Sequence, residues 1–157
     1  MMPIKPFFSS HLHGLVVQAA MLSFLLCNAA LAADSPLFRP LAPDTADLNQ
    51  YRWHNRPVVI FAPSAKDADY IQQIAILNHN QAELAERDII VLSDTSPAAH
   101  GQLRSQLKPQ GFAVVLVGKD GGMKLRDTTP LSAEVLLSTI DRMPMRKAEA
   151  NPALPHN

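Results

Sequence analysis

The polar residues best suited to chemistry gather in residues 118–126, which read Gly-Lys-Asp-Gly-Gly-Met-Lys-Leu-Arg. Glycines beside lysines are typical of a phosphate-binding loop, because bare backbone amides and an ammonium group both attract anions. The Gly-Lys-Ser/Thr ending of such a loop is missing, and apolar runs flank the stretch on both sides. Asp120, Gly121 and Gly122 therefore predict a hairpin turn, in which glycine supplies the positive φ. The turn explains the glycines and leaves the cations unexplained.

A set of basic residues in and after this stretch is the main candidate for binding an anion or a partner protein. Lys124 and Arg126 lie two apart on the predicted second strand of the hairpin, so their side chains share a face. The alternative is that Asp127 and Asp141 neutralise these cations in a network of surface ion pairs. Both interpretations stay open on the sequence. The candidate set consists of Lys119, Lys124, Arg126, Arg142, Arg146 and Lys147.

Three further residues have chemistry of their own. Ser64 starts a predicted helix, where free backbone N–H groups attract anions and where its hydroxyl is a candidate nucleophile. An ordinary helix cap is favoured, because Ser often caps helices and no Gly-x-Ser-x-Gly elbow surrounds it. Met143 and Met145 could offer thioethers to Cu(I), but soft sites usually include cysteine, so packed methionines are favoured. The sequence predicts no catalytic residue, no metal and no cofactor.

The first 32 residues have the pattern of a secretory signal peptide. Lys5 precedes an apolar run over residues 15–27, and Ala30 and Ala32 give the small-x-small form of a cleavage site. The run is shorter than the about 20 residues that a membrane-spanning helix needs. Cys27, the only cysteine, lies inside this leader, so the mature chain would have no thiol. We therefore expect an exported protein, periplasmic or secreted, that is not membrane-spanning after cleavage and has no thiol–disulfide activity.

The elements that would position the candidate residues begin with two buried strands. Residues 56–63 and 87–93 are continuous apolar runs, typical of strands buried on both faces. A helix capped by Ser64 and ending near Glu86 joins them, so the two strands should be parallel with a right-handed crossover. The predicted hairpin over residues 112–127 then adds two antiparallel strands.

Two more helices complete the order β-α-β-α-β-β-α. A short or irregular helix follows Ser96 and Pro97, and a final helix capped by Ser132 follows the hairpin. This order predicts an α/β fold of the thioredoxin-like kind, a mixed four-stranded sheet with helices on both faces. The predicted organisation is a signal peptide at residues 1–32, an extended lead-in at 33–47, the thioredoxin-like domain at 48–147 and a frayed tail at 148–157.

Four segments of the chain resemble a narrower family. YRWHNRPVVIFAP, ERDIIVLSD, VVLVGKDGGMKLR and LLSTIDRMPMR are similar to domain-of-unknown-function family 4174 (DUF4174). That family includes exported bacterial proteins and domains of vertebrate matrix proteins of the equarin and sushi-repeat type. The resemblance implies a thioredoxin-like fold without catalytic cysteines and no established activity. Residues 62–69 stand where thioredoxins begin their first helix with Cys-x-x-Cys, and Phe112 and Ala113 stand where thioredoxins usually place a proline.

The resemblance and the missing thiol favour an exported, non-catalytic module that binds or adheres to an unknown partner protein. The alternative is a small-anion-binding protein or enzyme that uses the basic residues near the hairpin, and copper binding by the methionines is a third hypothesis. We expect no nucleic-acid partner, because 14 basic residues balance 14 acidic ones. Trp53, beside Tyr51 and Arg52, is expected to pack the lead-in onto the sheet, although such residues also anchor partners.

Overall fold

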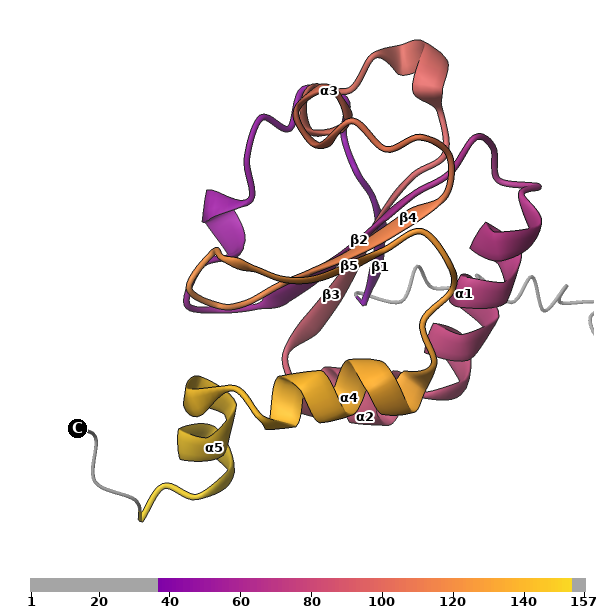
Figure 1. Ribbon diagram of the computed structural model, residues 1–157. Helices are drawn as coiled ribbons and strands as arrows, with labels where there is room; N and C mark the ends of the chain where they lie inside the picture. Colours follow the sequence, from indigo (N-terminus) through magenta and orange to yellow (C-terminus); the bar gives the residue numbers. More distant parts are fainter. Residues whose placement is uncertain (1–36, 154–157) are drawn as a thin grey trace, which may run out of the picture. The chain divides into compact units, whose positions relative to one another are not determined.

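The computed structural model describes residues 37–153, so the predicted signal peptide and residues 154–157 lie outside the described part. Within it, five strands form a mixed sheet in the spatial order β1-β3-β2-β4-β5 (Figure 1). The strands are β1 (Phe38–Pro40), β2 (Arg56–Phe61), β3 (Ile89–Asp94), β4 (Ala113–Val117) and β5 (Met123–Asp127). The helices are α1 (Ala68–His79), α2 (Gln81–Glu86), α3 (Gln102–Leu107), α4 (Ala133–Asp141) and α5 (Pro144–Ala150), with 3₁₀ turns η1 (Asn49–Tyr51) and η2 (Pro97–Ala99).

The central strands pair as the sequence predicts. β2 is parallel to β3 and antiparallel to β4, and β4 and β5 form the antiparallel hairpin. Every residue of β2 and β4 is buried, which explains why both strands, apart from Arg56 at the start of β2, are apolar without alternation. In the connecting turn Gly121 has a φ of 84°, the positive value that the Asp-Gly pair predicts.

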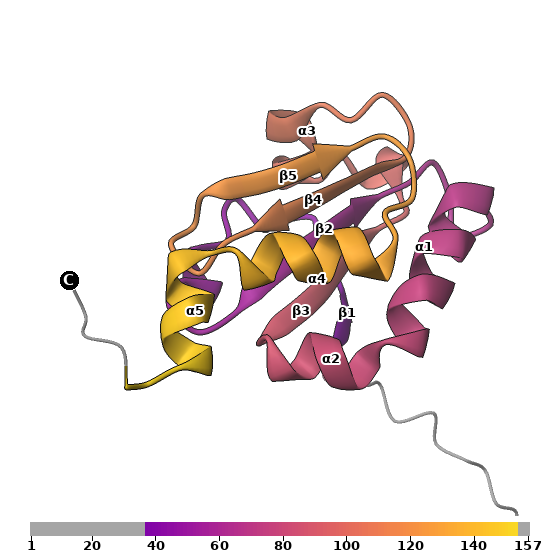
Figure 2. The same ribbon diagram turned by 60° about the horizontal axis from the view of Figure 1, so that its bottom comes forward.

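Helices cover both faces of the sheet (Figures 1 and 2). Because successive strand side chains point to opposite faces, β2 contributes to two cores. Val58 and Ile60 pack into the core under α1, α2 and α4, and Val59 and Phe61 pack into the core under α3. The mixed α/β, thioredoxin-like class is therefore confirmed, although the sheet has five strands in the described residues rather than the predicted four.

The extra strand comes from the segment predicted as an extended lead-in. β1 pairs in parallel with β3 at the sheet edge, and the Leu41 amide continues the pairing by donating to the Ser93 carbonyl at 2.8 Å. Pro40 lies at the end of this edge strand, where the missing N–H costs no ladder hydrogen bond. The predicted extended lead-in thus contains a short edge strand.

The first helix begins later than predicted and is interrupted. Asp67, not Ser64, is the N-cap of α1, and its carboxylate accepts a hydrogen bond from the Tyr70 amide at 3.0 Å. Asn80 ends α1 and separates it from α2, while its side-chain amide donates to the Ile76 carbonyl at 2.7 Å. Gln73 is fully buried within α1, where its amide group bonds both the N–H and the carbonyl of Leu131 before α4.

The later helices follow the prediction in part. η2 starts at Pro97 after Ser96 and α3 follows Gly101 separately, so this region is short and irregular as expected. Ser132 caps α4 by accepting from the Val135 amide at 3.2 Å, as predicted. Fraying was expected from residue 148, but α5 continues to Ala150 because its side chains form ion pairs with the sheet edge. Among the described helices, none has the length and apolarity needed to cross a membrane.

Candidate functional site

The basic residues grouped by the sequence do not converge on one pocket. Lys119 and Arg146 are buried, whereas Lys124, Arg126 and Arg142 are exposed. Lys124 Nζ lies 2.6 Å from Asp120 Oδ2 across the hairpin turn, and Arg126 Nη2 donates to the Leu107 carbonyl at 2.9 Å. Arg142 makes a long contact of 3.5 Å with the Thr139 hydroxyl. Lys124 and Arg126 on the hairpin therefore have different partners within the chain and do not form a shared anion site.

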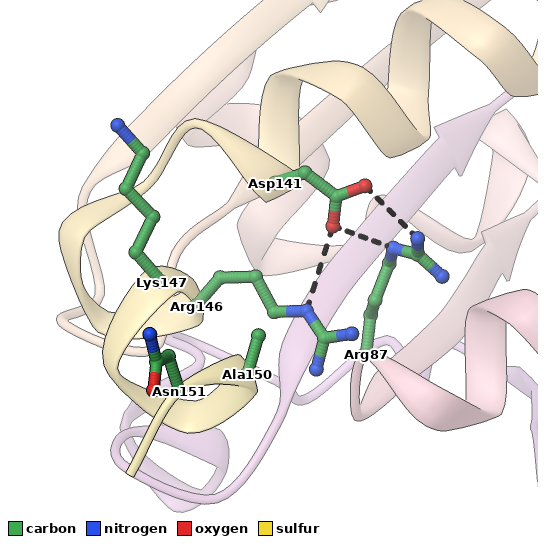
Figure 3. Close-up of a pocket in the computed structure, with 6 residues that line it drawn as sticks. All are labelled: Arg87, Asp141, Arg146, Lys147, Ala150 and Asn151. Atoms are coloured by element: carbon green, nitrogen blue, oxygen red, sulfur yellow. Dashed lines mark hydrogen bonds and ion pairs between the residues drawn. The ribbon is translucent and has the colours of Figure 1, made fainter. Parts of the chain in front are cut away.

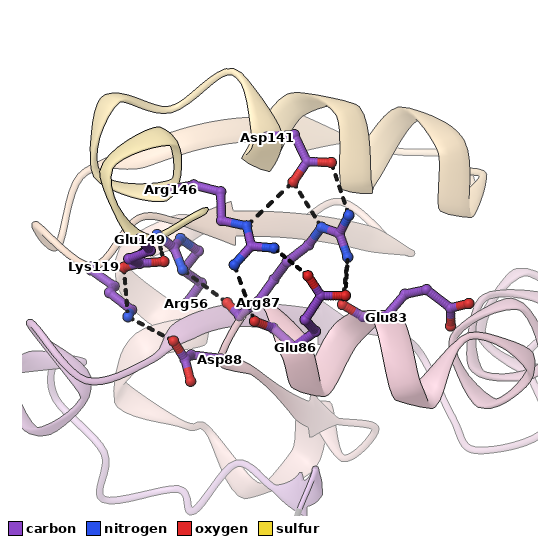
Figure 4. A network of polar contacts seen from close by, with 9 residues as sticks. All are labelled: Arg56, Glu83, Glu86, Arg87, Asp88, Lys119, Asp141, Arg146 and Glu149. Atoms are coloured by element: carbon purple, nitrogen blue, oxygen red, sulfur yellow. Dashed lines mark hydrogen bonds and ion pairs between the residues drawn. The ribbon is translucent and has the colours of Figure 1, made fainter. Parts of the chain in front are cut away.

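Lys119 and Arg146 belong to a network of ion pairs at the edge where β2 begins and β4 ends (Figure 4). The first half of this network contains Lys119 and the buried Arg56. Lys119 Nζ lies 2.7 Å from Asp88 Oδ2 and 2.8 Å from Glu149 Oε1. Arg56, at the start of β2, donates from Nη1 to the Arg87 carbonyl and from Nη2 to both oxygens of Glu149 at 3.1 Å. Glu149 on α5 thus bridges two cations supplied by the sheet and its turn.

The second half of the network holds α4 and α5 against the end of α2. Arg146 lies 2.6 Å from Glu86 and 3.5 Å from Asp141, which also pairs with Arg87 through two hydrogen bonds of 2.8 and 2.9 Å. The Arg87 hydrogen bonds hold the pKa of Asp141 below its usual value, with a smaller contribution from Arg146. The same Asp141 carboxylate raises the pKa of Arg87. Asp141 therefore contacts one member of the basic set, Arg146, while its two shorter bonds go to Arg87, which is outside that set.

Asp127 does not share that role. Its carboxylate accepts hydrogen bonds from the amide and hydroxyl of Thr129, and these bonds lower the pKa of Asp127. The predicted pairing of Asp127 with the hairpin cations is wrong, because the carboxylate caps the turn that follows β5. A local partner two residues away needs less chain ordering than a long cationic side chain.

A cavity of about 430 Å³ lies beside this network and is drawn in Figure 3. Asp141 is paired with both Arg87 and Arg146 there, and the Lys147 ammonium points away from these three side chains (Figure 3). The cavity therefore offers no converging group of free cations to a small anion. Its lining residues are Arg87, Asp141, Arg146, Lys147, Ala150 and Asn151.

A second polar cluster, which the sequence analysis missed, lies at the opposite ends of β2 and β3. Arg104 Nε lies 2.8 Å from Asp94 Oδ2, and its Nη2 donates to the carbonyls of Ala62 and Asp94. The guanidinium also lies over the Phe61 ring, 5.4 Å from its centroid. Burial raises the pKa of Asp94, but hydrogen bonds from Arg104 and the Ser96 amide outweigh this and lower it. The cluster clamps the loop after β2 to β3 and α3.

Ser64 and Met143 have structural roles in the described part of the chain. The Ser64 hydroxyl accepts a hydrogen bond from the Lys66 amide at 3.2 Å in the loop before α1, so its predicted role as helix cap is wrong. Met143 packs against the main core and precedes the first turn of α5, as packed methionines would. Met145 is partly exposed. No cluster of His, Asp or Glu able to hold a metal is found among the described residues.

Trp53 is the most exposed large apolar side chain among the described residues, and Arg52 lies beside its ring. Tyr51 packs against the α3-side core as expected, but the expected packing of Trp53 is wrong, because its side chain is 59% exposed. Trp53 has a φ of 67°, and its amide donates to the Lys119 carbonyl at 2.7 Å. The Arg52 guanidinium lies 5.5 Å from the centroid of the Trp53 ring. A Cβ on Gly121 would lie 3.1 Å from Arg52 Nε, so the turn glycine makes room for this pair.

Comparison with known families matches residues 47–149, more than half of the chain, to the domain of unknown function DUF4174. The chain belongs to this family. The resemblance carried by the four sequence segments is confirmed. The matched range ends at Glu149, the residue of α5 that bridges Arg56 and Lys119. The DUF4174 domain thus includes α5.

Known proteins that resemble this DUF4174 domain include a curated sequence relative and solved structures that share its fold. Coiled-coil domain-containing protein 80 of Danio rerio is 26% identical over 132 residues, which cover 65% of this chain but only 15% of that protein. Reduced 2-Cys peroxiredoxin of Plasmodium vivax has a TM-score of 0.51 at 15% identity, covering 66% of this chain and 84% of its own. Plasmodium yoelii Prx1a has a TM-score of 0.50 at 14% identity, covering 69% and 83%. These structures share the thioredoxin fold with this chain.

Proposed function

We propose that this DUF4174 chain is an exported, non-catalytic thioredoxin-like module that binds a partner protein through Arg52 and Trp53. The predicted signal sequence and the family resemblance support export. The loop after β2, which carries the reactive thiols in thioredoxins, contains Ala62, Ser64 and Ala65 here and no cysteine. Ser64 within that loop bonds a backbone amide rather than a histidine or carboxylate among the described residues, so it lacks the base that a nucleophile needs.

The exposed Arg52–Trp53 pair is the observation that carries the proposal. Trp and Arg are the residue types that most often supply the binding energy of protein interfaces. Trp53 also adopts a left-handed backbone conformation, which costs about 1–2 kcal/mol for a non-glycine residue. The hydrogen bond to Lys119 and the stacking of Arg52 hold the indole in this position before any partner arrives. Such preorganisation lowers the entropy lost on binding.

The partner that fits is a protein with an apolar pocket for the indole and an acidic group beside it for Arg52. Cation–π stacking leaves the second face of the ring and the guanidinium edge available for contact. The small-anion and enzyme hypotheses have less support, because the buried cations Lys119 and Arg146 are engaged by carboxylates. The copper hypothesis has less support because Met143 packs against the core.

The test is affinity capture from the exported fraction of the source cells, compared across three versions of the immobilised full chain. Wild type should retain a specific protein, Trp53→Ala should lose it, and Ile71→Ala should keep it. Ile71 is a matched control because it is 54% exposed on α1, close to the 59% of Trp53. Equal recovery by wild type and Trp53→Ala, or no protein retained by wild type, would overturn the proposal.

The proposed export is tested separately. Amino-terminal sequencing of the exported chain should start at Ala33, the residue after the predicted cleavage site.

A further inference from the structure

Helix α5 is held to the domain by charge rather than by apolar burial. Arg146 is its only buried residue, and Met145 on the same helix is partly exposed. Its polar contacts with the sheet edge and with α2 are the ion pairs of Glu149 and Arg146 and a hydrogen bond from Arg146 Nη1 to the Glu86 carbonyl. A helix of this length is not stable by itself in water, so it depends on those pairs. Elements with few buried apolar contacts open locally far more often than the core does.

The groups beneath Glu149 form a slot shaped for a carboxylate. Arg56 has 0% exposure and Lys119 has 9%, so both cations are held by the body of the domain. Arg56 Nη2 contacts both Glu149 oxygens at 3.1 Å, and Lys119 Nζ contacts one of them at 2.8 Å. In Figure 4 the Glu149 carboxylate lies between these two side chains, on the opposite side of Lys119 from Asp88. The slot is therefore occupied by the Glu149 carboxylate, which α5 supplies.

Opening of α5 changes the charge balance at this edge. With Glu149 removed, Asp88 still pairs with Lys119 but Arg56 loses its carboxylate partner, which leaves one positive charge uncompensated. Arg56 Nη1 stays bonded to the Arg87 carbonyl, so the guanidinium keeps its orientation. Its Nε is buried and has no hydrogen-bond partner among the described residues, so the group retains unused donor capacity. An oriented and uncompensated cation is a strong attractor for an anion.

We propose that Arg56 and Lys119 form a carboxylate-binding site that Glu149 occupies as an internal ligand. A carboxylate from outside the chain binds there when α5 opens, and it holds α5 in the open position. The outside carboxylate competes with an internal one of high effective concentration, so a physiological ligand needs contacts beyond this slot. The inference does not depend on the Arg52–Trp53 surface, because Trp53 uses only the backbone carbonyl of Lys119, whereas the slot uses the Lys119 side chain.

The first experiment measures acetate binding by the full chain with Glu149→Ala. Sodium acetate should raise the melting temperature of this variant and saturate, whereas sodium chloride at equal ionic strength should not. The double variant Glu149→Ala with Lys119→Met should lose the acetate response. Glu134→Ala, which removes an exposed carboxylate from α4, should show none. An equal response of Glu149→Ala to acetate and chloride would overturn the proposal.

The second experiment uses wild type, so the test stands even where the variant does not fold. Amide hydrogen exchange of residues 144–150 reports the opening of α5. Acetate at about ten times its Kd should raise that exchange roughly tenfold, because a ligand specific for the open form shifts the equilibrium by mass action. The Kd comes from Glu149→Ala or from the dependence of exchange on acetate. Exchange of α4 should not change, and equal acceleration by acetate and matched chloride would contradict the proposal.

Discussion

Replacement of Asp94 by Asn tests the clamp at the end of β2 and β3. The side chains of Arg104 and Asp94 are 13% and 9% exposed, and they are joined at 2.8 Å. Removal of one partner from a buried ion pair costs about 3–5 kcal/mol. Arg104 keeps the Ala62 and Asp94 carbonyls as acceptors, so we expect the low end of that range. Asp94→Asn should therefore lower the free energy of unfolding by about 3 kcal/mol at pH 7.

The loss should depend on pH in a defined direction. The folded-state pKa of Asp94 is lowered, so its contribution is fully present above the unfolded-state value of about 3.9. That contribution disappears as the pH falls through the folded-state pKa, since the wild-type carboxylate then becomes protonated as well. Wild type and Asp94→Asn should thus differ most near neutral pH, begin to converge below about pH 4 and become equal once the pH has fallen below the folded-state pKa.

Urea unfolding followed by far-ultraviolet circular dichroism at several pH values measures both quantities. Asp127→Asn is the matched control, because the pKa of Asp127 is also lowered but its partner is the adjacent Thr129 on the surface. That control should lose no more than about 1 kcal/mol. A deficit for Asp94→Asn below about 0.5 kcal/mol at pH 7, or the same deficit at pH 3 and pH 7, would refute the reasoning about a buried ion pair.

Three further predictions concern the hairpin turn, Trp53 and α5. Gly121→Ala should lower stability by about 1–2 kcal/mol in the same unfolding assay, because its φ is 84° and the new Cβ meets Arg52; no change would refute the strained turn. Trp53→Gly should be more stable than Trp53→Ala, because glycine accepts a φ of 67° without strain; the reverse order would show that strain is absent. Salt at about 1 M, where the Debye length is about 3 Å, should speed amide exchange in α5 modestly and not in α4, because Glu149 and Glu86 are 29% and 65% exposed while their cationic partners are buried; equal rates at low and high salt would show that α5 is held by other forces.

The predictable part of this protein is the part that depends on residue type along one segment. Continuous apolar runs marked β2 and β3 because strands buried on both faces are apolar along most of their length. The Asp-Gly turn between β4 and β5 was visible because only a few residues accept its positive φ. Ser132 was found as a cap because its hydroxyl acts on the adjacent turn. Each of these features is set by residues within one short segment of the chain.

The elements that were missed depend on contacts between distant segments. β1 carries prolines and is a strand only because β3 offers an unpaired edge beside it. The segment of α5 has no apolar stripe, and it is fixed by Glu149 reaching Arg56, which lies 93 residues earlier in the chain. Ser64 and Asp67 are both good caps, and the geometry of the loop decided in favour of Asp67.

The sequence by itself determined the fold class and the family of this protein, since burial patterns and turn residues act within short segments. It also determined that the loop after β2 carries no thiol, because that follows from composition alone. Only the tertiary structure decided which cations are paired, because Lys119 and Arg146 meet their carboxylates through folding rather than through spacing. It likewise decided that Trp53 lies outside the core, since a ring packs or projects according to the backbone conformation beneath it.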